Sequence, residues 1–433
     1  MIKLSNRTVI EIVIAVWIIV AVGYLTHTPI DHRAHDISGH LEYTKIVFSE
    51  LRLPHPYEGW ETFQPPLYYL INSLIAPPHN ILEGLYHIIY VRYLSVFYGL
   101  ISILVIAWFL MKIDISPFYR MLVLLFIVTT PKFVFMFSSY NNDSLATMLS
   151  ILIVGLSYKL FSDQSMRYRL LLLLVATLGP YAKYTALLAI LSLLIFCSRN
   201  LLKLKLPNKN QIKTALILIT SLVLFLPWAY FHNYLSTGKL LPTNVENRED
   251  RTINFTKLKH IVGVVFRIPQ LLRSKFNYTH EWDSPWVYPS WGEIHPVTKR
   301  YDYFAFVLIT SAIGECIYSS PNVIFFWIIL FIHLLIHPMA LSNIFRSDIT
   351  KLSALIIFFT HAVQISQIIL FPTIPGNMDY RYIAWSWVAW AVLYGYLLTF
   401  KNKIINYLIA SVFLSGILLQ IYILFTLEGG YWY

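Results

Sequence analysis

The sequence predicts an all-α membrane protein with about eleven transmembrane helices, a cytoplasmic N-terminus and an outer C-terminus. Apolar residues make up 57% of the 433-residue chain and charged residues only 13%. Soluble domains, by contrast, carry about a quarter charged residues. Apolar runs of nearly bilayer-spanning length recur along the chain, for example at residues 94–111, 215–228 and 323–336. A single soluble core could not bury so many of them.

The first predicted span follows Lys3 and Arg7, and no small-residue cleavage site comes after its apolar run. We therefore expect an uncleaved signal anchor. The fifth and sixth spans are short and meet at Gly179 and Pro180, a helix-breaking pair. The predicted spans are residues 8–25, 88–111, 119–137, 144–160, 169–180, 183–197, 214–234, 322–344, 352–371, 382–400 and 404–425.

The distribution of Lys and Arg sets the orientation, because short cytoplasmic connections are enriched in both. With the N-terminus inside, every cytoplasmic connection contains Lys or Arg, most densely at residues 199–213. The short outer connections contain only Lys132, Lys183 and Arg381. Residues 303–318 are also fairly apolar, but counting them as a span would put the later basic connections outside. We expect them to form a helix on the outer surface or against the bundle.

Two long outer loops, residues 26–87 and 235–321, interrupt what we predict to be a single transmembrane domain over residues 1–433. Loops of this length are usually functional or folded in their own right. In the first loop, residues 40–53 and 66–75 are expected to form short amphipathic helices on the membrane surface. The second loop mixes aromatic with charged residues.

The net charge is +11, but no basic stripe with interleaved aromatic residues stands apart from the apolar segments. We therefore expect membrane lipids rather than nucleic acid as partners. Cys197 and Cys316 fall on opposite sides of the predicted membrane, so neither a disulfide nor a zinc site is expected. Low cysteine use favours a bacterial inner membrane, with an endoplasmic reticulum membrane as the alternative. The sequons at Asn254 and Asn277 are too short to decide.

The first candidate site residues follow the first span. Charge is costly at membrane depth, so ionisable groups near the outer face are the first candidates for function. Asp36 and His40 are four residues apart and would share a face of a helix that starts near Asp36. Asp36 also suits the N-cap of that helix, and the two roles are compatible. Asp31 is a weaker candidate for the same function.

Two further polar positions lie later in the chain. Gln64 precedes Pro65 and Pro66, which set an extended entry to a helix, so this run is also explained as a loop-to-helix junction. Asp143 follows Asn142 at the outer end of the fourth span, where a carboxylate also suits the N-cap and the positive helix end. For Asp143, function and capping are equally good explanations of the sequence.

Three cations, Arg92, Lys183 and Arg381, are predicted at the same level of the membrane. Each alone is explained by snorkelling or by an ion pair with a nearby carboxylate. Together with the carboxylates they suit an anionic ligand at the outer interface, above all a phosphate. A sugar on a polyprenyl phosphate fits, because cations would stabilise the leaving phosphate while a carboxylate takes the proton of the attacking acceptor hydroxyl. One such displacement inverts the stereochemistry.

The order of these motifs resembles the GT-C superfamily of membrane glycosyltransferases, and within it the protein O-mannosyltransferase and aminoarabinose-transferase branch. The matching features begin with an acidic residue in a long first outer loop. They continue with Gln-Pro-Pro-Leu-Tyr-Tyr from Gln64, Asn-Asp ending at Asp143, Lys-Tyr-Thr from Lys183 and Arg-Tyr from Arg381. The resemblance covers most of the chain and thins in the second outer loop and after residue 400.

The resemblance implies a polyprenyl-phosphate sugar donor, a glycan, lipid or protein acceptor, and inverting transfer of a hexose or pentose on the outer side. It implies Asp36 as the base, Asp143 as the second acidic position, and Lys183 and Arg381 as cations that contact the donor. One departure is Ile37 after Asp36, where the branch commonly has an Asp-Glu pair. The remaining candidates for substrate binding are His40, Gln64 and Arg92.

Two other classes of protein compete with this interpretation. A lipid or solute transporter is the first, although the sequence has no inverted repeat and few ionisable residues in mid-span. A glycan polymerase or ligase that uses a lipid diphosphate donor is the second. No metal ligands are predicted, and the use of a divalent cation as cofactor stays open.

Overall fold

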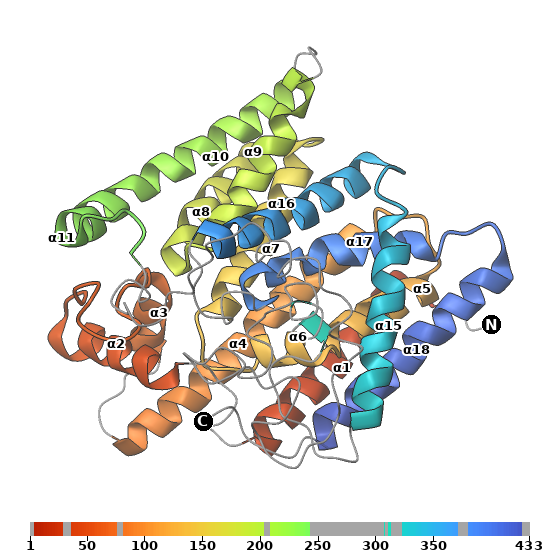
Figure 1. Ribbon diagram of the computed structural model, residues 1–433, viewed down its shortest axis with the longest axis horizontal. Helices are drawn as coiled ribbons and strands as arrows, with labels where there is room; N and C mark the ends of the chain where they lie inside the picture. The colour runs from red at the N-terminus through yellow and green to blue at the C-terminus, as the bar shows by residue number, and fades with distance from the viewer. Residues whose placement is uncertain are drawn as a thin grey trace.

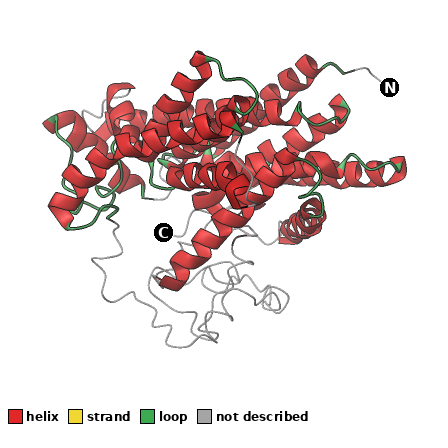
Figure 2. Cartoon of the chain, turned by 90° about the horizontal axis from the view of Figure 1, so that it is seen from above, coloured by secondary structure: helices red, strands yellow, loops and turns green. Residues whose placement is uncertain are grey.

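The computed structural model describes residues 4–28, 36–75, 81–202, 208–242, 307, 311–312, 323–370 and 380–426. Within these ranges every regular element is a helix, which confirms the predicted all-α class (Figure 2). The expectations for Asp31, for Cys316, for both sequons and for most of residues 303–318 lie outside the described residues.

Helices lie at every interval where the sequence predicts a span. In the described part of the chain, six helices are long and apolar enough to cross a bilayer, which makes this a polytopic membrane protein, while the full number of crossings stays a prediction. The elements are α1 (Asn6–His27), α2 (Ile37–Glu50), α3 (Leu67–Ile75), α4 (Ile81–Leu110), α5 (Pro117–Val128), α6 (Pro131–Met136), α7 (Asp143–Leu160), α8 (Met166–Ala182), α9 (Ala186–Leu202), α10 (Lys209–Pro227), η1 (Trp228–Tyr234), α11 (Leu235–Thr237), α15 (Val323–Leu341), α16 (Asp348–Leu370), η6 (Tyr380–Ser386), α17 (Trp387–Leu397) and α18 (Lys403–Thr426).

In three predicted spans the helix is interrupted or changes its type. In the third, α5 ends at Val128 and α6 starts at Pro131, because a proline suits the first turn of a helix better than its interior. In the seventh, α10 continues into η1, a π-helix, and the tenth starts as η6, a 3-10 helix, before α17. Changes of this kind are frequent where a helix meets a functional region.

The break predicted at Gly179 and Pro180 is misplaced by about one turn. Helix α8 runs through both residues and ends at Ala182, and the chain turns extended at Lys183. Pro180 lacks an N–H and removes one helix hydrogen bond, but only two residues of the helix follow it, so the loss falls at the helix end. Lys183 is therefore an extended residue between α8 and α9.

Helix α7 runs through the middle of the bundle, whereas α10 lies along its edge. In the apolar stretch of α7, 78% of the residues are buried, against 33% in the stretch that contains α10. Leu216, Val223 and Leu226 of α10 are each about half exposed, as expected for a helix face that contacts lipid. Polar groups at the start of α7 are therefore enclosed by protein on all sides.

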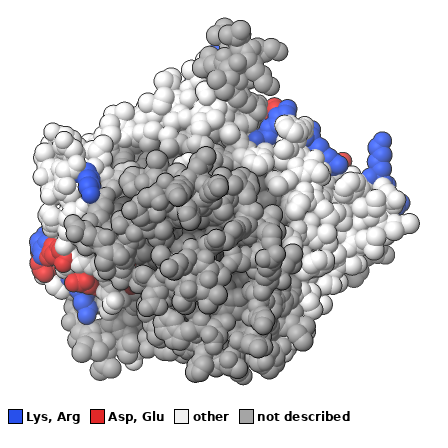
Figure 3. Space-filling model, viewed as in Figure 1, with Lys and Arg blue, Asp and Glu red and all other residues white. Residues whose placement is uncertain are grey.

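The short helices of the first outer loop lie at one end of the bundle. Helices α2 and α3 contact each other at the left of Figure 1, where α11 also lies, and the N-terminus is at the opposite edge. On the face in Figure 3, charged side chains of the described residues gather in two groups, at the left and right edges.

Candidate functional site

Asp36 stands at the start of α2 in a conformation that the sequence did not predict. Its backbone is left-handed, with φ at 57°, and its carboxylate makes no capping hydrogen bond to the helix. Instead, Trp60 Nε1 donates to Asp36 Oδ1 over 2.6 Å. Asp36 is thus the N-cap residue of α2, as expected, but its side chain does not form the capping hydrogen bond, because the carboxylate binds an indole 24 residues later.

Two glycines let α2 approach the loop that follows it. A Cβ at Gly39 would lie 2.9 Å from Glu61 Cγ and 3.1 Å from Trp60 Cδ1, and a Cβ at Gly59 would lie 2.7 Å from Glu42 Oε2. Contacts this short exclude a side chain without a shift of the neighbours. The close approach brings Trp60 to Asp36 and places Glu61 against the first turn of α2.

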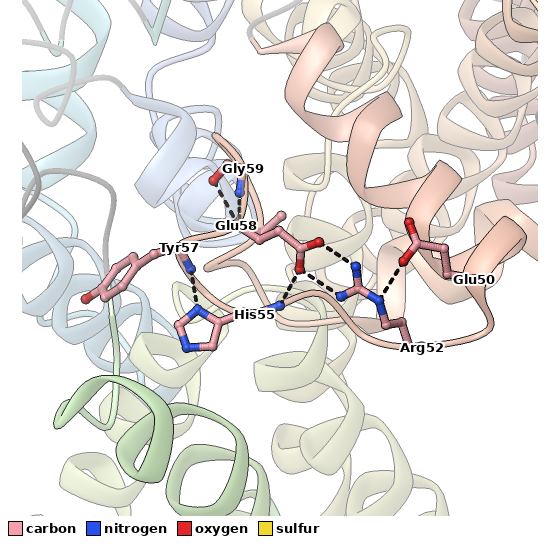
Figure 4. A network of polar contacts seen from close by, with 7 residues as sticks. Glu50, Arg52, His55, Tyr57, Glu58 and Gly59 are labelled. Carbon is pink, nitrogen blue, oxygen red and sulfur yellow. Dashed lines mark hydrogen bonds and ion pairs between the residues drawn. The ribbon is translucent and has the colours of Figure 1, made fainter.

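A network of exposed polar side chains holds the same loop in shape (Figure 4). Arg52 donates to both carboxylate oxygens of Glu58 over 2.8 and 2.5 Å, and its Nε donates to Glu50 over 2.7 Å. Glu58 also accepts the backbone N–H of His55 over 2.9 Å. The hydrogen bonds from Arg52 lower the pKa of Glu58 to about 2, so this carboxylate is charged at neutral pH.

Tyr184 ties the first outer loop to the rest of the bundle. Its hydroxyl donates to the carbonyl oxygen of Phe63 over 3.1 Å and accepts Asn233 Nδ2 over 2.9 Å. Asn233 belongs to η1, and Tyr184 directly follows Lys183. The loop, the turn after α8 and the end of the seventh span are therefore joined at one residue.

His40 lies one turn into α2 and is buried among tyrosines. His40 Nδ1 is 2.9 Å from the hydroxyl of Tyr69, and the ring of Tyr69 stacks on Tyr43 at 3.7 Å. Burial lowers the pKa of His40 to about 4, so the imidazole is neutral at pH 7. The nearby charges add smaller, opposed effects on this pKa, with Asp36 and Asp143 raising it and Lys183 and Arg381 lowering it. Four charges from distant parts of the chain thus act on one imidazole.

Asp143 forms a buried ion pair with Lys183. The two atoms Asp143 Oδ1 and Lys183 Nζ are 2.6 Å apart, and Lys183 also donates to Asn142 Oδ1 over 3.1 Å. The N-cap of α7 is Asn142 rather than Asp143, and Asn141 Oδ1 accepts the backbone N–H of Ser144. The capping alternative for Asp143 is therefore wrong, because its carboxylate is directed to the lysine.

The ring of Tyr382 contacts both cations of the site. The Arg381 guanidinium is 4.9 Å from the Tyr382 ring centre and the Lys183 ammonium is 5.3 Å from it. Arg381 Nη2 also donates to the hydroxyl of Tyr382 over 2.9 Å. A ring that faces two cations reduces their mutual repulsion and keeps both positive charges near the same point.

Two of the predicted substrate-binding residues differ in their placement. Gln64 is buried in the loop beside the site, and its backbone N–H donates to the carbonyl oxygen of Glu61 over 3.0 Å. Arg92 is also buried, but its guanidinium donates to the carbonyl oxygen of Ser138 and to Thr28 Oγ1, both over 2.9 Å. Arg92 thus links α4 to the chain around it and stands apart from the charges that act on His40.

Glu61 is a buried residue of the site for which the sequence predicted no role. Its side chain is only 4% exposed, and it follows Trp60, the residue that binds Asp36. Burial and, as the second cause, the charge of Asp36 raise the pKa of Glu61 to about 8, against smaller opposing effects of Lys183, Gln64 and Arg381. The available signal was an acid placed between a tryptophan and two prolines in an otherwise uncharged run.

The site therefore offers acidic, cationic and neutral groups at one end of the bundle. In the part of the chain that the structure describes, no three His, Cys, Asp or Glu side chains are arranged to hold a metal ion. The carboxylates can accept protons or hydrogen bonds from hydroxyl groups, and the cations can bind an anion such as a phosphate.

Comparisons with known proteins identify the fold. No family model and no curated protein matches the sequence. The structure is similar to the oligosaccharyltransferase of Archaeoglobus fulgidus in its apo form, with a TM-score of 0.58 and 12% identity over 98% of this chain and 56% of the other. It is also similar to ArnT from Cupriavidus metallidurans, in its apo state (TM-score 0.53, 13% identity, 90% of this chain, 60% of ArnT) and bound to undecaprenyl phosphate (TM-score 0.51, 11% identity, 90% and 60%).

These similarities show that this polytopic helical protein has a fold like that of the archaeal oligosaccharyltransferase and of ArnT. The chain spans little more than half the length of the solved structures that it matches, 56% of one and 60% of the other.

Proposed function

We propose that this protein transfers a sugar from a polyprenyl phosphate to an acceptor at the non-cytoplasmic face of a membrane, with inversion at the anomeric carbon. The observation that carries the proposal is that Lys183 pairs with Asp143 and contacts the same Tyr382 ring as Arg381, while the charges of all three and of Asp36 act on the buried His40. A membrane protein has no structural need to gather four charges from such distant segments, since each is costly to bury.

The nature of the donor is supported by the cations and by the fold. Lys183 has three N–H donors, of which Asp143 and Asn142 take two, so one remains for a phosphate oxygen. One structure of similar fold, ArnT, is bound to undecaprenyl phosphate, and another, the archaeal oligosaccharyltransferase, is in complex with a dolichol-phosphate. A lipid-linked phosphate would keep its tail in the bilayer while its headgroup reaches Lys183 and Arg381.

In the proposed reaction Asp36 is the base. Trp60 holds one carboxylate oxygen, and within the described chain the other oxygen has no hydrogen-bond donor, so it is available to the acceptor hydroxyl. The hydroxyl oxygen bonds to the anomeric carbon as its proton passes to Asp36, and the bond from that carbon to the phosphate oxygen breaks. Lys183 and Arg381 stabilise the negative charge that develops on the leaving phosphate.

The test is transfer by the purified protein in lipid nanodiscs, with polyprenyl-phosphate and polyprenyl-diphosphate sugars offered side by side. We expect product from the monophosphate donor, and loss of at least about a thousandfold in rate for Asp36→Asn, the size of effect that removal of a central catalytic group has elsewhere. Asp163→Asn is the matched control, since the Asp163 side chain is 39% exposed and contacts Lys159 and the backbone N–H of Ser165, none of them in the site.

Three results would redirect the proposal. Full activity of Asp36→Asn removes Asp36 as the base. Product only from the diphosphate donor favours a glycan polymerase or ligase. Movement of a lipid or solute across the bilayer without any covalent product favours a transporter. The acceptor class, which we propose to be a glycan, lipid or protein, follows from the product formed in the same assay.

A further inference from the structure

Glu61 is placed where it can act on Asp36, and this inference rests on the proposed role of Asp36 as a base. Trp60 donates to Asp36, and the next residue, Glu61, has its Cγ 2.9 Å from the point where a Cβ on Gly39 would lie. The backbone N–H of His40 donates to the carbonyl oxygen of Asp36, which makes Gly39 part of the turn that Asp36 starts. Glu61 thus rests on the same helical turn as the proposed base.

The surroundings of Glu61 do not supply a direct counter-ion. In the described part of the chain no Lys or Arg forms an ion pair with Glu61. Lys183 is the cation with the largest effect on the pKa of Glu61, and it is paired with Asp143. The charged and titratable groups that face Glu61 are Asp36, Lys183, Arg381 and Tyr69. When two carboxyl groups are neighbours and one of them is buried, the pair has its lowest free energy with one proton bound.

Glu58 lies three residues before Glu61 in the same loop, and its pKa is shifted in the opposite direction. Glu58 accepts two hydrogen bonds from Arg52 on the surface, and these lower its pKa to about 2. Burial raises the pKa of Glu61 to about 8. Similar side chains in the same loop are therefore held in opposite protonation states at neutral pH.

We propose that Glu61 is a positioning residue that keeps its proton during the reaction, so that Asp36 carries the single negative charge of the pair. The neutral carboxyl sets the charge and orientation of Asp36 without repelling the phosphate of the donor. In the transfer step the acceptor proton goes to Asp36, and the proton of Glu61 stays where it is. Ionisation of Glu61 would place a second negative charge beside the base and slow the reaction.

The first experiment reads the protonation of Glu61 directly and needs no activity. Infrared spectra of the full chain in nanodiscs report protonated carboxylic acids by their carbonyl stretching band. We expect Glu61→Gln to remove part of this band at pH 7, and the wild-type band to titrate away near pH 8. Glu58→Gln, the matched control, should leave it unchanged. A band that Glu61→Gln does not alter at pH 7 overturns the proposal.

The second experiment is the pH profile of transfer from the polyprenyl-phosphate donor. The wild-type rate should fall about tenfold per pH unit above about 8, as one ionisation requires. Glu61→Gln mimics the protonated state and should keep its rate near pH 7 while losing this alkaline decline. An equal loss of rate at every pH, with the decline retained, would mean a merely structural role. If the wild type transfers no sugar, the proposed function fails, and the infrared result still decides the state of Glu61.

Discussion

Two buried polar clusters in this bundle differ in charge. The outer one is the site described above, in which Asp143 and Lys183 form a buried ion pair beside other charged groups. The second lies among the helices and consists of neutral side chains. It comprises Thr129 after α5, His333 and His337 on α15, Tyr394 on α17 and Gln420 on α18.

The neutral cluster is explained by helix packing. Thr129 donates to Gln420 over 2.7 Å, Gln420 Nε2 lies 3.3 Å from His333 Nε2, and the hydroxyl of Tyr394 is 3.2 Å from His337 Nε2. Hydrogen bonds of this kind join neighbouring helices where no water is available. The cluster at the candidate site differs, because it contains several charged groups that helix packing does not require. Buried polar side chains alone therefore do not indicate a functional site, whereas buried charged groups that packing does not require do indicate one.

The largest effect is expected from breaking the ion pair at the outer site. Lys183→Ala leaves Asp143 buried without its partner and should lower the free energy of unfolding by about 3–5 kcal/mol. It should also abolish transfer. Denaturant unfolding in detergent micelles measures the first effect and the donor assay the second.

A double variant separates stability from function at the same place. Lys183→Met with Asp143→Leu removes both charges and should recover most of the lost stability, because no unpaired charge remains. Transfer should stay absent. Recovered transfer would contradict a catalytic or binding role for this pair.

In the neutral cluster, Gln420→Leu is the matching change. It removes the partner of Thr129 and a contact of His333 and should lower the free energy of unfolding by about 1–3 kcal/mol. The rate of transfer per folded molecule should not change. A selective loss of rate in a fully folded variant would contradict the division between the two clusters.

A smaller effect is expected from Trp60→Phe. The substitution keeps the ring but removes the N–H that donates to Asp36, which should cost about 1 kcal/mol in transition-state stabilisation because Asp36 is partly exposed. This corresponds to about a fivefold slower transfer. Steady-state kinetics measure it, with unaltered thermal unfolding as the control, and a rate equal to wild type would separate Trp60 from the base.

The smallest effect is expected at the surface network. Arg52→Gln breaks the bonds to Glu50 and Glu58, which are exposed, so the loss of stability should stay below about 1 kcal/mol. The transfer rate should remain within about a factor of two. A loss as large as that of Trp60→Phe would show that the network positions the site more tightly than its exposure suggests.

The sequence predicted the helices well because hydrophobic length and charge placement act locally along the chain. It did not predict the break at Thr129, η1 or η6, because these depend on hydrogen bonds between neighbouring segments. The start of α2 at Asp36 was predicted, but the capping bond was not formed, since Trp60 competes for the carboxylate.

The site was predicted in part for the same reason. Acids and cations near the ends of the apolar segments can be recognised from their spacing, and in this way the sequence indicated both members of the ion pair of Asp143 and Lys183. Glu61 was missed because its burial depends on the close approach of a glycine in another element. Arg92 was predicted to lie with the other two cations, but its side chain is directed to Ser138, which depends on packing.

The pair of Asp143 and Lys183 has a consequence for biosynthesis. Only 40 residues separate them, and they lie at facing ends of α7 and α8, which contact each other. A helical hairpin that leaves the ribosome with its carboxylate already matched by an ammonium group avoids inserting either charge alone into lipid. The two helices would thus enter the membrane as a unit, long before the segment that carries Arg381 has been translated.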